Sequence, residues 1–186
     1  MNSVEYGAYN KLMEIIKKRR TVRKFKNILV PDDMIRKMVE AARWAPSALN
    51  SQPWEFIIVK NMETKKKIRE IYTSARERLG IYKQDTSFIE HATLIGVCVQ
   101  MEGKSYRIAA SLAMQSFLLA ATSLDIFSTI LGVALNFEED KQTITEMLSI
   151  TDNYELVILL GIGYADEMPG RKELRNLEDI IHYERF

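Results

Sequence analysis

The sequence predicts an α+β fold. Segments whose apolar residues recur at helical spacing alternate along the chain with a few short runs typical of strands. No linker, repeat or low-complexity stretch interrupts the 186 residues. Apolar residues make up 47% of the chain and charged residues 27%, which is enough to build a core without disulfides or a structural metal. We therefore expect a single domain over residues 1–186, with helices packed on a sheet.

The first half of the chain predicts two helices, a strand and a third helix. Residues 5–18 have apolar side chains on one helical face and cations at the end, where they complement the helix dipole. Pro31 suits the first turn of a second helix, which Pro46 closes. Trp54–Val59 is aromatic and β-branched and predicts a strand, and residues 64–78 predict a charged helix.

The second half predicts three strands and two helices. Residues 92–99 form a continuous apolar run, typical of a strand buried on both faces. Residues 106–124 predict a long helix that is apolar almost all round, so it must be covered by its own core or by a second subunit. Residues 127–133 predict a short strand, 138–148 a helix and 155–162 a further buried strand.

Charge and cysteine content argue against several classes of protein. The 26 basic and 25 acidic residues give a net charge of +1, so nothing in the overall balance favours nucleic acid or a membrane surface. Residues 1–18 have no signal-peptide core, and the longest apolar stretch, 156–165, is far below the ~18 residues of a membrane span. Cys98 is the only cysteine, and we interpret it as a buried hydrophobe. These features predict a cytoplasmic protein.

The basic segment, residues 17–26, is the first segment with possible chemistry. Its cations could be a solvated helix terminus, or a patch that binds nucleic acid. The neutral overall charge and the lack of interleaved aromatic residues count against nucleic acid. In a third interpretation, Arg19, Arg20, Thr21 and Arg23 leave the helix together and converge on one phosphate.

The second segment is residues 45–54, directly before the first predicted strand. Its two prolines and small polar residues predict a stiff loop. A stiff loop does not require Asn50, Gln52 and Trp54 at these positions. Because loops held between a helix and a strand are favoured sites for ligand contact, we expect this loop to bind a ligand.

Taken in order and spacing, these two segments resemble the N-terminal signature of the nitroreductase family. Residues 113–121, 127–132 and 160–164 are similar to the family's central helix, the turn after it and its last strand. The resemblance implies a nitroreductase-like fold with a mostly antiparallel sheet flanked by helices. It also implies an intertwined homodimer that binds FMN at the subunit interface.

The resemblance further implies which residues bind the flavin. Arg19 would hold the phosphate and Arg23 the pyrimidine edge of the ring, where a cation stabilises the anionic reduced flavin. Arg20 and Thr21 would contact the flavin from the same subunit, and further contacts are implied for Leu131, Gly132, Lys172 and Arg175. The contacts implied for the other subunit come from Pro46, Ser47, Ala48 and Asn50. Leu131 and Gly132 would act through backbone N–H groups, and Lys172 and Arg175 would grip the phosphate.

Three positions depart from the family pattern. The family usually carries a basic residue at the position of Leu174. The resemblance therefore identifies the C-terminal phosphate contacts only to within one residue. It also often has an acidic residue early in the central helix and a glycine just after it, where this chain has Ala109 and Asp125. Asp125 can still end the helix, because aspartate tolerates left-handed backbone better than most residues.

The function implied is an FMN-dependent oxidoreductase. It would transfer a hydride from NAD(P)H, a transient donor, through flavin N5 to a nitroaromatic, quinone or similar acceptor in ping-pong fashion. No catalytic side chain and no metal are expected, because His91 and His182 have no nucleophile or ligand pattern around them. Reductive dehalogenation and oxygen-dependent flavin breakdown are alternatives, but such relatives typically add a lid where residues 83–90 are short. A nucleic-acid-binding module is the third hypothesis.

Overall fold

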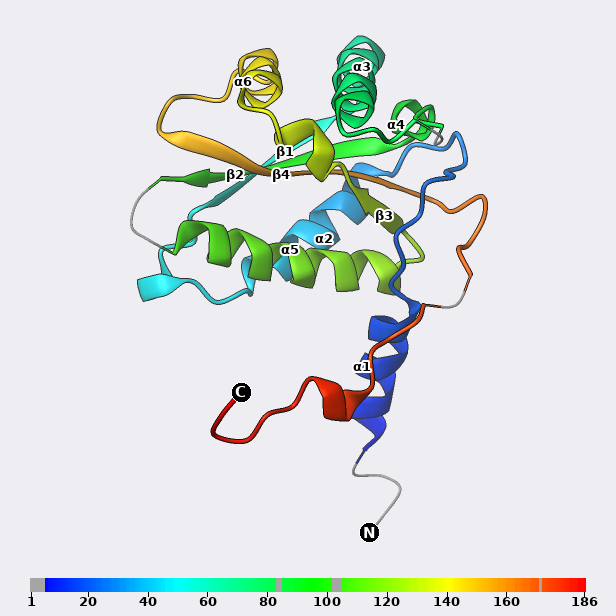
Figure 1. Ribbon diagram of the computed structural model, residues 1–186, viewed down its shortest axis with the longest axis vertical. Coiled ribbons are helices and arrows are strands. Elements are labelled where there is room, and N and C mark those ends of the chain that lie inside the picture. Colours follow the sequence, from blue (N-terminus) through cyan, green and yellow to red (C-terminus); the bar gives the residue numbers. More distant parts are fainter. Residues whose placement is uncertain (1–5, 83–84, 102–104, 171) are drawn as a thin grey trace.

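A computed structural model describes residues 6–82, 85–101, 105–170 and 172–186. It has three layers, with a sheet between two layers of helices (Figure 1). The strands are β1 (Trp54–Val59), β2 (Thr93–Gln100), β3 (Phe127–Ile130) and β4 (Tyr154–Gly163). The α-helices are α1 (Gly7–Lys18), α2 (Asp32–Arg43), α3 (Met62–Arg78), α4 (Phe88–His91), α5 (Tyr106–Ser123) and α6 (Glu138–Met147). Short 3₁₀ helices are η1 (Ala48–Asn50), η2 (Gly132–Leu135) and η3 (Leu177–Asp179).

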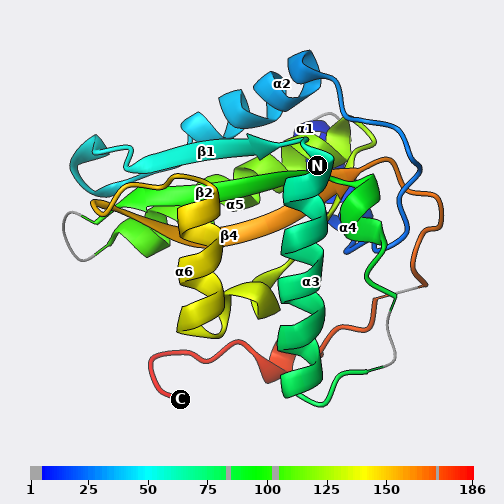
Figure 2. The ribbon, with the colours of Figure 1, turned by 90° about the horizontal axis from the view of Figure 1, so that it is seen from above.

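The sheet has the order β1-β2-β4-β3, and neighbouring strands pair antiparallel throughout. This confirms the predicted α+β class with an antiparallel sheet. Helices α3, α4 and α6 cover one face of the sheet, and α2 and α5 cover the other (Figures 1 and 2). The central strand β2 is buried at each residue except Gln100, as its continuous apolar sequence predicts.

Each face of the sheet has its own hydrophobic core. Because side chains alternate along a strand, Val97 of β2 joins the core under α2 and α5, whereas Cys98 joins the core under α3 and α6. In the first core Phe117 of α5 stacks on Phe56 of β1 with ring centroids 6.3 Å apart. In the second, Phe88 meets the ring of Tyr72 edge-on at 6.3 Å. The two cores fix the helices on both sides of one sheet.

Several predicted boundaries were wrong by a few residues. Helix α3 begins at Met62, because the side chain of Asn61 accepts a hydrogen bond from Thr64 N at 3.0 Å and caps the helix. The strand predicted over 127–133 ends at Ile130, where the backbone turns into η2. The sequence pattern also missed the four-residue α4. Asp125 follows α5 with a φ of +58°, as predicted for a residue that ends the helix.

Part of the apolar surface of the chain is left uncovered. Helix α5 buries one side against the sheet, but Ile108 is 62% exposed and Leu112 43% exposed. Helix α1 buries none of its residues, and Leu12 lies on its exposed apolar face. Helix α1 and the C-terminal segment lie beside the layers and not between them (Figure 1). The prediction that α5 needs cover is therefore met only on its inner side.

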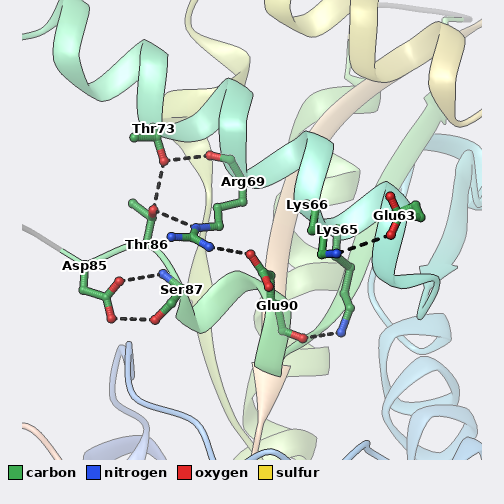
Figure 3. A network of polar contacts seen from close by, with 9 residues as sticks. All are labelled: Glu63, Lys65, Lys66, Arg69, Thr73, Asp85, Thr86, Ser87 and Glu90. Carbon is green, nitrogen blue, oxygen red and sulfur yellow. Dashed lines mark hydrogen bonds and ion pairs between the residues drawn. The ribbon is translucent and has the colours of Figure 1, made fainter.

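A polar network fastens the segment 85–91 to α3 (Figure 3). The buried Lys65 ammonium donates to the carbonyls of Glu90 and Ala92, the latter at 3.0 Å, and burial lowers the pKa of this lysine. Arg69 pairs with the Glu90 carboxylate at 2.5 Å and donates from Nε to Thr86 Oγ1 at 3.2 Å. The network satisfies the carbonyls at the end of α4 and fixes it on α3.

Gly163, at the end of β4, is required by packing. A Cβ at this position would lie 2.9 Å from Cδ1 of Phe25, a buried ring that cannot move away cheaply. We predict that Gly163→Ala lowers the free energy of unfolding by about 1–3 kcal/mol, measured by urea denaturation. Gly7→Ala is the control, because a Cβ there meets nothing within 4 Å. Equal stability of the two variants would contradict this packing.

The thiol of Cys98 is predicted to be inert. The side chain is 2% exposed, and burial raises the pKa of the thiol to about 11. At pH 8 only about one thiol in a thousand is then ionised, and the thiolate is the reactive form. We expect no labelling of the folded protein by a thiol-specific disulfide reagent at pH 8, and full labelling in urea. Rapid labelling of the folded protein would show that the core opens here.

Candidate ligand site

The basic segment leaves α1 and runs along the edge of the sheet. Arg19 ends the helix, with its N–H donating to the carbonyl of Ile15 at 3.0 Å. Thr21 then forms a parallel bridge to Ser128 of β3, and Val22 N donates to Ser128 O at 3.0 Å. Val22 is buried, whereas Thr21 is exposed. The extended backbone therefore turns its apolar side chains inward and leaves polar ones at the surface.

The same segment pairs with the chain that follows β4. Lys26 N donates to Tyr164 O, and Asp166 N donates to Lys24 O, both at 2.9 Å. Lys24 also forms an ion pair with Glu167, whose carboxylate raises the pKa of Lys24. The sequence did not predict this ribbon, which is the pairing of residues 24–26 with residues 164–166. Asp166 and Glu167, two acidic residues shortly after the last strand, were the one available signal in the sequence, because they could pair with cations elsewhere in the chain.

The ribbon borders a small cavity, and two cations near it form no ion pair with any residue that the structure describes. The cavity holds about 180 Å³ and is lined by Thr21, Val22, Arg23, Lys24, Glu167 and Pro169. Among the described residues, neither Arg19 nor Arg23 makes an ion pair or a side-chain hydrogen bond. Guanidinium groups without a carboxylate partner are available to a planar or phosphate-like anion.

Leu131 and Gly132 lie on the same edge of the sheet as the basic segment. They directly follow β3, the strand to which Thr21 is bridged. The N–H of Leu131 donates to the carbonyl of Leu159 at 2.7 Å, so it is not available to a ligand. A Cβ on Gly132 would meet only Ile130 Cγ2, at 3.8 Å. Of the predicted pair, Gly132 is the residue whose backbone a ligand could approach closely.

The second predicted segment forms a strained loop around η1. Ser47 accepts hydrogen bonds on its carbonyl from Asn50 N and on Oγ from Gln52 N, both at 3.0 Å. Leu49, Asn50 and Gln52 have φ values of 52°, 55° and 46°. Left-handed backbone costs a non-glycine residue about 1 kcal/mol or more, and such strain concentrates at ligand sites. Pro46 and Ala48 are exposed, as is the side chain of Leu49 at the tip of the loop.

The loop and the basic segment lie at opposite ends of the sheet. Gln100, at the end of β2, donates its N–H to Pro53 O of the loop at 2.9 Å. The basic segment instead pairs with Ser128. Ser128 is opposite Ile162 of β4, which in turn is opposite Thr93 at the start of β2. The seven-residue separation along β2 is about 23 Å. Figures 1 and 2 both show η1 and the end of α1 far apart. The two groups therefore cannot meet on one small ligand within a single chain.

The C-terminal cations lie beyond the ribbon. Arg20 donates to the carbonyl of Gly170, which places the start of this segment beside the basic segment. Lys172 is exposed two residues later, and Arg175 donates to the carbonyl of Asp179 at 2.7 Å. Leu174, the departure from the family pattern, is exposed as well. Lys172 is thus two residues along the chain from the carbonyl that Arg20 holds, and the contacts of Lys172 and Arg175 with a phosphate stay a prediction.

Metal and membrane features can be described briefly. Among the residues described, histidine, cysteine and carboxylate side chains form no group of three or more that could hold a metal ion. In the same part of the chain, no helix has both the length and the apolar character to cross a membrane.

The basic segment and the strained loop both lie within a part of the chain that matches a known family. The nitroreductase family model matches residues 16–98. A candidate NADH dehydrogenase/NAD(P)H nitroreductase of Methanothermobacter thermautotrophicus is 30% identical over 181 residues, which cover 94% of this chain and 87% of that protein. Iodotyrosine deiodinase of Thermotoga neapolitana is 28% identical over 190 residues, covering 94% and 98%.

The fold has close counterparts among solved structures. An FMN-dependent nitroreductase from Clostridium difficile R20291 superposes with a TM-score of 0.73 at 26% identity, covering 94% of this chain and 99% of that one. The family model spans both the basic segment and the strained loop, and the relatives extend the match over nearly the whole chain. The chain belongs to the nitroreductase family.

Proposed function

We propose that this protein is an FMN-dependent oxidoreductase that transfers hydride from NAD(P)H to a small acceptor. The observation that carries the proposal is a pair of cations, Arg19 and Arg23, that form no ion pair within the described part of the chain and lie on the sheet edge that also holds Gly132. Such an edge suits FMN, which has a phosphate at one end and, at the other, a ring that becomes anionic on reduction. FMN dependence of the similar Clostridium difficile nitroreductase supports the choice of cofactor.

Arg19 is suited to the phosphate. It stands at the end of α1, where no side chain of the described residues competes for its guanidinium. A bidentate pair of N–H donors matches two phosphate oxygens, which a lysine could not do. Thr21 adds a hydroxyl on the same exposed side of the strand-like segment.

Arg23 and Gly132 are suited to the flavin ring. When bound, FMN supplies the two-electron chemistry, and the protein supplies position and charge. Arg23 lies in the wall of the small cavity, two residues beyond the bridge to β3. A fixed cation there favours the reduced ring, and the Gly132 backbone can come close enough to donate a hydrogen bond to it.

The rest of the site comes from a second copy of the chain. Pro46, Ser47, Ala48 and Asn50 lie on the loop at the far end of the sheet, and the positions of β2 that are level with the loop and with the basic segment are about 23 Å apart. A homodimer brings the loop of one chain to the cations of the other, and symmetry makes two such sites. The exposed apolar residues Leu12, Ile108 and Leu112 are available for the contact.

Donor and acceptor would use one pocket in turn. Gly161 and Gly163 lie within β4 and no α-helix follows them in the described part of the chain, so the strand is not a dinucleotide-binding turn. NAD(P)H therefore acts as a transient substrate that leaves before the acceptor enters, which gives ping-pong kinetics. A nitroaromatic, a quinone or a similar flat oxidant is the acceptor class we propose.

Reductive dehalogenation is the second candidate. The likeness to iodotyrosine deiodinase of Thermotoga neapolitana over 94% of this chain favours it. Against it, the segment 85–91 is held on α3 by Arg69 and Lys65 (Figure 3), which favours an open pocket over a substrate-closing lid. Turnover of a quinone but not of a halotyrosine separates the two reactions.

We predict that the purified protein takes up FMN and shows a flavin absorbance spectrum. Arg19→Ala combined with Arg23→Ala should weaken FMN binding at least about 100-fold, because two charge-assisted contacts are lost. Flavin fluorescence quenching measures the affinity. Anaerobic addition of NADH or NADPH to the wild-type complex should bleach its absorbance.

Lys17→Ala combined with Lys26→Ala is the matched control, because it removes two exposed cations of the same basic segment. It should leave FMN affinity within about threefold. A wild-type protein that stays colourless with excess FMN, or equal losses in the two double variants, would overturn the proposed function.

A further inference from the structure

The side chain of Arg20 is bound to the protein's own backbone. Its Nη2 donates to the carbonyl of Gly170, which lies 150 residues further along the chain. Its neighbours differ, because Arg19 and Arg23 make no side-chain hydrogen bond to the described residues. Arg20 joins two segments, whereas Arg19, which is half-buried like Arg20, and the exposed Arg23 are left for a ligand.

Among the described residues, Gly170 is the last of the C-terminal segment that is hydrogen-bonded to the rest of the fold. Before it, Asp166 N bonds to Lys24 O, and Glu167 pairs with Lys24. From residue 172 to 186, the hydrogen bonds of the described chain are local, as in Arg175 to Asp179 O. All of these later residues are exposed. The Arg20 contact therefore holds the segment beside the basic segment at Gly170.

We propose that Arg20 is a positioning residue: by holding Gly170, it keeps Lys172 close to Arg19 and so strengthens binding of the phosphate end of the flavin without contacting it. The inference rests on the proposed flavin function. Two residues span at most about 7 Å of extended chain, so fixing Gly170 confines Lys172 to the neighbourhood of Arg20. A cation confined near the phosphate binds it more tightly than one on a free segment, because less chain entropy is lost.

A positioning role for Arg20 and direct binding of the phosphate by Arg20 predict different affinities in variants that combine the loss of Arg20 with the loss of Lys172. If Arg20 acts through Lys172, its loss matters only while Lys172 is present. If Arg20 contacts the phosphate, the losses of Arg20 and Lys172 are independent and multiply. A residue that merely supports the fold would affect flavins with and without a phosphate alike.

The test compares FMN with riboflavin, which lacks the phosphate, in wild type, Arg20→Ala, Lys172→Ala and the double variant. We expect Arg20→Ala and Lys172→Ala each to weaken FMN binding about tenfold and to leave riboflavin binding within about twofold. The FMN affinity of the double variant should lie within about twofold of that of Lys172→Ala. Lys26→Ala is the matched control, since it removes one exposed cation from the same basic segment and leaves the side-chain contacts of the C-terminal segment in place, and it should not change the ratio of the two affinities.

Three results would overturn the inference. These are a double variant that binds FMN about a hundredfold more weakly than wild type, equal losses for FMN and riboflavin, and an unchanged affinity in Lys172→Ala. Should Arg20→Ala not fold, Arg20→Gln replaces it throughout the same comparison. A wild-type protein that binds neither flavin would instead refute the proposed function, and this inference with it.

Discussion

The arrangement depends on how the chain leaves α1 and joins the edge of the sheet. Val22 and Phe25 are buried. The backbone of Val22 is hydrogen-bonded to β3, and the backbone of residues 24 and 26 is hydrogen-bonded to the chain after β4. Gly163 makes room for the ring of Phe25 at this point. Because the segment is paired at Val22 and again at Lys24 and Lys26, its cations are held on a fixed backbone. A binding group on a rigid element is more exact than one on a free loop.

A second constraint follows from the length of β2. The strained loop around η1 and the basic segment are attached to opposite ends of this strand. Neither can move to the other without breaking the sheet. Strain at Leu49 and Asn50, and exposed apolar residues on α1 and α5, are features that a lone chain does not need. A second copy of the chain gives both of them a use, and this is why we propose a shared site.

Much of the fold could be predicted from the sequence. The buried strand over 92–99 and the helix over 106–124 followed from hydrophobic period and length, and Asp125 takes the left-handed backbone expected of it. The boundaries at Asn61 and Leu131 could not be predicted, because a cap and a turn depend on single hydrogen bonds. The order of the cations and of the loop residues indicated a site. The contact of Arg20 with Gly170 could not be foreseen, because nothing in either segment specifies a partner 150 residues away.

The central claim is that each flavin site takes its cations from one chain and its loop from another. Mixing two defective chains, one with Arg19→Ala and Arg23→Ala and the other with Ser47→Ala and Asn50→Ala, tests it most directly. After joint unfolding and refolding in equal amounts, random pairing gives heterodimers in which one site is intact, so roughly a quarter of all sites should regain wild-type FMN affinity. A mixture that binds FMN no better than the two variants refolded separately would contradict the account.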